Sequence, residues 1–165
     1  MSEMYRLDEK NWPLERLWKA TGKVRGRYLG DVCLGMYEKW GDEAIELIGK
    51  VYANAADRTF LKGLRSFGIE GRGADALAMF FVISQSAIGY DMEIVELSEK
   101  RSVVRYHSCH IFPDPSPAAE QICRRANFQF EVRAAELLNP KLRVYYNKVR
   151  SGGAPYCEWV CELEE

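Results

Sequence analysis

The stretch "RYHSCHIFPDPSP", residues 105–117, concentrates groups that can do chemistry. It holds both histidines of the chain, His107 and His110, with Cys109 between them. On a strand His107 and Cys109 point to the same side, and an imidazole that removes the proton of a thiol produces a thiolate nucleophile. We therefore predict Cys109 as a nucleophile or polarising group, with His107 or His110 as its general base. A half-buried, hydrogen-bonded histidine with a purely structural role fits the same spacing and stays open as the alternative.

The cysteines of the C-terminal half offer a second chemistry, metal binding. Thiolates are preferred ligands of Zn²⁺ and of iron–sulfur clusters. None of these cysteines forms a C-x₂-C knuckle, and free cysteine is also among the most buried residue types. We therefore expect no cofactor, with a zinc ion or an iron–sulfur cluster as the alternative. The candidate ligands are Cys109, Cys123, Cys157 and Cys161.

Aromatic and basic side chains on the expected strands can line a pocket for a small molecule. The forked guanidinium of Arg105 or Arg143 suits both oxygens of a carboxylate, so these arginines are candidate anchors. Tyr106, Tyr146 and Trp159 are candidate pocket walls. The alternatives are cross-strand packing for the aromatic residues and an exposed strand edge for the arginines.

The elements that must position these residues follow from the hydrophobic periodicity. Apolar residues recur at helical spacing in four stretches, and β-branched or aromatic residues alternate in two hairpins. The pattern predicts an α+β fold in which helices pack on one face of a small antiparallel sheet, in the order ααα-ββ-α-ββ. The expected helices are residues 13–40, 42–68, 74–88 and 116–140, and the expected hairpins are residues 91–112 and 141–165.

Three glycines repeat at every fourth position of the first expected helix: Gly22, Gly26 and Gly30. Each costs about 1 kcal/mol relative to alanine inside a helix, so we expect something to offset them. One interpretation is a kinked helix; the other is close approach of a second helix along the small-residue face. This face is also the candidate contact surface of a homodimer.

The composition narrows the class of protein. A chain of 165 residues is expected to fold as a single domain, residues 1–165, without needing disulfides or a metal. The net charge of −1 supplies no basic excess for nucleic acid, and the charged N-terminus does not resemble a signal peptide. "LAMFFVI", residues 77–83, is too short to cross a bilayer. We expect a cytoplasmic protein whose five cysteines are unpaired.

Three stretches resemble one known family: "FLKGLRSFGIEG", "VVRYHSCHIF" followed by "AEQIC", and "NPKLRVYYNKVRSGGAPYCEWVCEL". Residues 55–164 are similar to the L-2-amino-thiazoline-4-carboxylic acid hydrolase family and its uncharacterised relatives. Cys109, Cys123 and Cys157 match the family's three cysteine positions. This chain departs from the pattern at His110, where a proline commonly follows the strand-end cysteine. At the level of fold the arrangement also resembles the 4-vinyl reductase type of ligand-binding domain.

The resemblance implies a hydrolase that opens a ring by breaking a carbon–nitrogen bond. Its substrate would be small and carboxylated, such as a sulfur-containing heterocycle. The alternative function is a non-catalytic sensor module that binds a ligand or a metal through the same cysteines. In both cases we expect a small-molecule ligand. Because Cys109, Cys123 and Cys157 occupy a strand end, a helix and a neighbouring strand, we also expect them to converge on one pocket.

Overall fold

The computed structural model describes residues 13–164 and has an α+β architecture, which confirms the expected fold class. Its elements are α1 (Leu14–Trp40), α2 (Asp42–Ser66), α3 (Ala74–Ala87), β1 (Met92–Leu97), β2 (Arg101–Tyr106), α4 (Pro117–Ile122), the π-helical turn η1 (Cys123–Asn127), α5 (Gln129–Leu138), β3 (Leu142–Lys148), the 3₁₀ turn η2 (Arg150–Gly152) and β4 (Cys157–Leu163).

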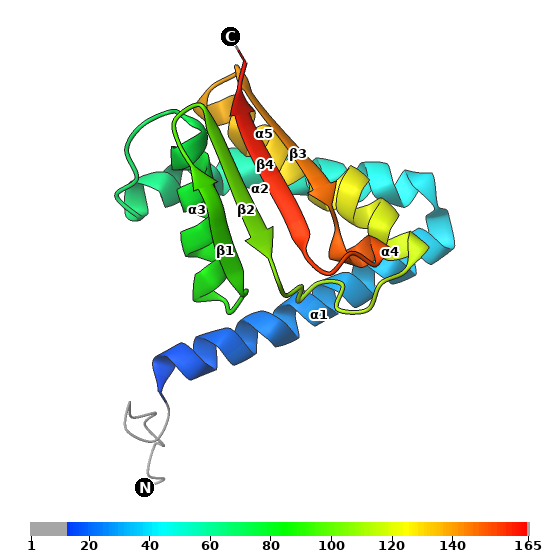
Figure 1. Ribbon diagram of the computed structural model, residues 1–165. Helices are drawn as coiled ribbons and strands as arrows, with labels where there is room; N and C mark the ends of the chain where they lie inside the picture. Colours follow the sequence, from blue (N-terminus) through cyan, green and yellow to red (C-terminus); the bar gives the residue numbers. More distant parts are fainter. Residues whose placement is uncertain (1–12, 165) are drawn as a thin grey trace, which may run out of the picture.

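The four strands form one antiparallel sheet in the order β1-β2-β4-β3. Figure 1 shows α2, α3 and α5 behind this sheet, while α1 runs across the end at which β2 finishes. At that end Tyr106 lies opposite both Met92 of β1 and Cys157 of β4. The two hairpins are therefore joined through their inner strands, as β2 pairs with β4.

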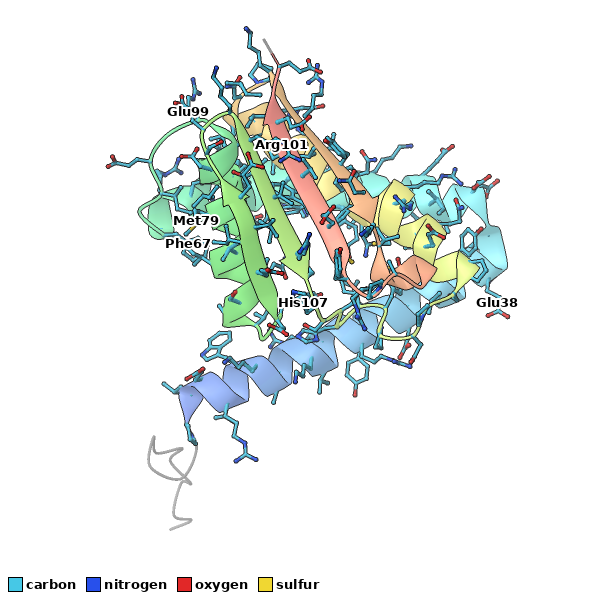
Figure 2. The ribbon with its side chains drawn as sticks, in the orientation of Figure 1. Glu38, Phe67, Met79, Glu99, Arg101 and His107 are labelled. Carbon is cyan, nitrogen blue, oxygen red and sulfur yellow. The ribbon has the colours of Figure 1, made fainter. Side chains whose placement is uncertain are left out.

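Side-chain alternation on β4 sends Cys157, Trp159 and Cys161 toward the helices, where all three are buried. Trp159 packs edge-on against Phe81 of the apolar helix α3, with ring centroids 5.6 Å apart and ring planes inclined at 61°. On the opposite face of the sheet, ion pairs such as Arg101 with Glu162 cover the strands (Figure 2). The alternation read from the sequence thus separates the core face from the solvent face.

Two apolar clusters make up the interior. One joins the sheet to α3 and α5 and contains Tyr106, Cys157 and Trp159. The other joins α1, α2 and α4, and Cys109 and Cys123 pack against its edge. The loop that follows β2 passes between the two clusters, so residues expected to do chemistry lie where the clusters meet.

Helix ends follow their local signals. Gly68 ends α2 with a φ of 65°, and the N–H of Ile69 donates to the carbonyl of Leu64. At the start of α4 the hydroxyl of Ser116 accepts a hydrogen bond from the N–H of Ala119, 3.1 Å away, and Pro117 occupies the first helical position. These boundaries are confirmed to within two residues.

The glycine face of α1 packs against loops of its own chain. A Cβ on Gly22 would lie 2.4 Å from the carbonyl oxygen of Ile88, and one on Gly30 would lie 1.9 Å from that of Ile111. Gly26 approaches His110 in the same way. The expectation of a second helix on this face is therefore wrong, since two loops make the close approach. A homodimer stays a prediction, and it would have to use another surface.

Within residues 13–164, no helix is both long enough and apolar enough to span a bilayer. The most apolar helix, α3, has only 14 residues and lies in the core.

Candidate ligand pocket

A cavity of about 90 Å³ lies at the junction of the two apolar clusters, and we call it the inner pocket. Its walls come from the ends of α3, β2 and β4, from η1, α5 and β3, and from the loop after β2. Its hydrogen-bonding side chains include Gln85, Tyr90, Tyr106, Asn127, Glu131 and Tyr146. Its sulfur-bearing side chains are Cys109, Cys123 and Cys157.

The expected convergence of Cys109, Cys123 and Cys157 on one pocket is confirmed. Cys161 lies elsewhere: it is four residues beyond Cys157 on β4, which at the rise of a strand places it about 13 Å away. The four-cysteine ligand set is therefore wrong, because one metal ion cannot reach both ends of that strand. Among residues 13–164, no group of three or more His, Cys, Asp or Glu is arranged to hold a metal.

The three pocket thiols are in environments that favour the protonated form. Burial raises the pKa of Cys109, that of Cys123 to about 12 and that of Cys157 to about 11. The sulfur of Cys109 accepts a hydrogen bond from the N–H of Phe112, 3.2 Å away, which offsets only part of this effect. A buried thiol of this kind is a poor nucleophile at neutral pH.

Neither histidine is placed to act as a base for the Cys109 thiol. His107 lies at the exposed end of β2 (Figure 2), and its Nε2 is 3.1 Å from a carboxylate oxygen of Glu93. His110 is buried beneath α1, with its ring centroid 4.3 Å from that of Tyr90. Burial lowers the pKa of His110. Among the described residues no hydrogen bond joins either imidazole to Cys109, so the expected thiol–imidazole pair does not form.

The two predicted anchors also lie outside the pocket. Arg105 is on the outer face of the sheet, with Nε 2.9 Å from a carboxylate oxygen of Glu158, and it stacks over the Tyr156 ring. Arg143 pairs with Glu164 and donates to the carbonyl of Pro140. These positions follow from alternation, since both arginines point to the solvent side of their strands.

Of the three aromatic residues predicted as walls, Tyr106 and Tyr146 line the inner pocket. Trp159 instead fills the core behind it, fully buried against Phe81. No arginine or lysine of residues 13–164 lines the inner pocket. The lining therefore supplies no cation to a carboxylated substrate, although the charge of Arg150, outside the lining, offsets part of the rise in the pKa of Cys109 and of Cys157.

Sequence reasoning missed Glu131, the one carboxyl group among the residues that line the pocket. The residue is half-buried, and desolvation of its carboxyl raises its pKa to about 7. The hydroxyl of Tyr146 donates to its Oε1 over 3.4 Å. Because this pKa lies near neutrality, the carboxyl changes charge in the range where the protein is expected to work.

The π-helical turn η1 explains how Glu131 reaches the pocket. The expected single helix over residues 116–140 is interrupted there, and the N–H of Phe128 donates to the carbonyl of Cys123, five residues earlier. The wider turn places Cys123, Asn127 and Glu131 along one wall. The four-residue spacing of Cys123, Asn127 and Glu131 could have indicated that these side chains share one side of the helix.

Comparisons with known proteins show the fold only. No protein-family model and no curated protein sequence matches this chain, so the family resemblance is not confirmed. The phenol-responsive sensory domain of the transcription activator PoxR, solved with phenol, has a TM-score of 0.60 and 10% identity, over 84% of this chain and 74% of its own. The trafficking protein particle complex subunit 3 from Naegleria fowleri, covalently bound to palmitic acid, has a TM-score of 0.60 and 15% identity, over 89% of this chain and 97% of its own.

Proposed function

We propose that this protein binds a small uncharged molecule in the inner pocket and works as a ligand-binding module, in the manner of a sensor. One observation carries the proposal. A partly enclosed cavity between two apolar clusters is lined by several convergent hydrogen-bonding groups and by no cation. Ligand sites combine an apolar enclosure with a few placed polar groups in this way.

The charges of the pocket select against anions. Above pH 7 the carboxylate of Glu131 repels a second negative charge, and no lysine or arginine among the pocket residues offsets that repulsion. A neutral hydroxyl or amide, by contrast, can pair with Asn127, whose Oδ1 is buried and has no partner among the described residues. The expected carboxylated substrate is therefore replaced in this proposal by a neutral one.

The volume limits the size of the ligand. A buried water needs about 10–15 Å³ of cavity volume. The 90 Å³ of the inner pocket therefore admits a single ring or a short chain. The two fold neighbours support a small-molecule function, since one was solved with phenol and the other with palmitic acid. A sensory domain among them favours binding without catalysis.

Hydrolysis is less well supported than ligand binding without catalysis. A ring-opening reaction needs an activated nucleophile, and the pocket thiols have raised pKa values with no imidazole beside them. Catalytic use of Cys109 would require a base in contact with its thiol, and among the described residues the hydrogen bond to its sulfur comes from the backbone N–H of Phe112.

Phenol is the probe that tests this proposal. We expect phenol to raise the midpoint temperature of unfolding and to give a calorimetric binding signal. Tyr146→Phe, which removes a pocket hydroxyl, should weaken binding about two- to tenfold, in line with one lost hydrogen bond. Tyr145→Phe is the matched control, because Tyr145 lies on the outer face of the same strand. Absence of any phenol binding, or equal effects of the two variants, would overturn the proposal.

A further inference from the structure

A second cavity, of about 290 Å³, lies between α1, α2 and the end of α3, and we call it the outer groove. It shares three wall residues with the inner pocket: Gln85, Tyr90 and Ile111. Its other walls include Trp18 and Leu29 of α1 and Tyr52 of α2. The two cavities are therefore neighbours separated by side chains.

Two of the shared residues belong to connections. Tyr90 lies between α3 and β1, and Ile111 lies in the loop after β2. Their side chains can change rotamer without breaking a helix or a strand pair. The Tyr90 ring already contacts both sides, since its centroid is 6.3 Å from the ring of Tyr106 in the inner pocket and 4.3 Å from that of His110 under α1.

The outer groove is lined by large apolar side chains, by Thr21 and Arg25 of α1, and by the polar end of Tyr52. Trp18 and Leu29, about three turns apart on α1, are 59% and 42% exposed. The hydroxyl of Tyr52 is buried and has no hydrogen-bond partner among the described residues. The close packing of Gly22 on Ile88 holds α1 against the groove.

We infer that the inner pocket and the outer groove form one site for an elongated molecule with a neutral hydrogen-bonding end and an apolar body. The polar end lies at Asn127 and Glu131, and the apolar body passes Tyr90 and Ile111 to cover Trp18 and Leu29. This inference rests on the proposed function, because it assumes that the inner pocket binds the polar end. Because the two cavities share the wall of Gln85, Tyr90 and Ile111, the inference assigns the groove to the same ligand.

A series of phenols with growing chains tests the inference: phenol, para-ethylphenol, para-butylphenol and para-hexylphenol. Each methylene that enters the groove should tighten binding about fourfold in calorimetric titrations, because that is the gain for burying one methylene group. Leu29→Ser should reduce the increase in affinity per methylene group and leave the affinity for phenol unchanged. Val32→Ser is the matched control, since Val32 is exposed on the same helix but lies outside the groove.

The outcomes separate the two proposals. If phenol binds but chain length has no effect, the groove is not part of the site, and the proposed function stands. If no member of the series binds, para-hexylphenol included, both are overturned. If Leu29→Ser changes the molar mass in light scattering while the series stays flat, a second copy of the chain covers the groove, and this inference is wrong.

Discussion

At the scale of single residues, the candidate site depends on how burial changes ordinary side chains. Glu131 is a glutamate inside a helix, and nothing in its type marks it as special. Desolvation raises its pKa to about 7, and the hydrogen bond from Tyr146 offsets part of that rise. The same burial makes Cys109 a protonated thiol, whereas its position between two histidines predicted a reactive one.

The reactivity of Cys109 follows from this environment. We expect Cys109 to react slowly with iodoacetamide at neutral pH, because only the thiolate attacks and burial disfavours it. The rate should rise as the pH passes the raised pKa, and His107→Gln and His110→Gln should leave it unchanged. Mass spectrometry of the labelled peptide provides the measurement. Fast labelling at pH 7 that either histidine substitution slows would restore the nucleophile hypothesis.

At the scale of elements, local signals predicted the helices and hairpins, and tertiary contacts decided the rest. The cap at Ser116 and the glycine end at Gly68 depend on neighbouring residues, so the sequence was sufficient to predict them. The π-helical turn at Cys123 was not predicted, because the apolar residues there keep the spacing of a regular helix. The glycine repeat correctly predicted a close approach but could not tell which segment approaches.

Two glycines of α1 give a matched test of that approach. A methyl group on Gly30 would meet the backbone of Ile111, whereas one on Gly35 meets nothing within 4 Å. Gly30→Ala should therefore destabilise the protein by about 1–3 kcal/mol through overpacking. Gly35→Ala should stabilise it by about 0.5–1 kcal/mol through helix propensity. Urea unfolding measures both, and equal free-energy changes would show that α1 does not lie against this loop.

At the scale of the whole molecule, the topology brings a loop, a π-helical turn and two inner strands to one point. Cys109, Cys123 and Cys157 could be picked from the sequence because their elements were predicted correctly. Arg105 was placed wrongly because its role depends on which face of the sheet meets the helices. The absence of a cation among the described pocket residues follows from the fold, and it changes the expected ligand from a carboxylate to a neutral molecule.

The central claim is that the inner pocket selects uncharged ligands through Glu131, and a calorimetric comparison of phenol with benzoate tests it most directly. Wild-type protein should bind phenol more tightly than benzoate at pH 8. Benzoate stays ionised at pH 6, but most Glu131 is then protonated, because its pKa is about 7. Benzoate binding should therefore strengthen from pH 8 to pH 6, by up to about tenfold, as the fraction of neutral Glu131 rises.

Glu131→Gln should remove this pH dependence and allow benzoate to bind equally at both values. The exposed residue Glu136, on the same helix, provides the control, and Glu136→Gln should behave like wild type. Benzoate binding at pH 8 that equals or exceeds phenol binding, or a pH dependence that survives Glu131→Gln, would contradict the account.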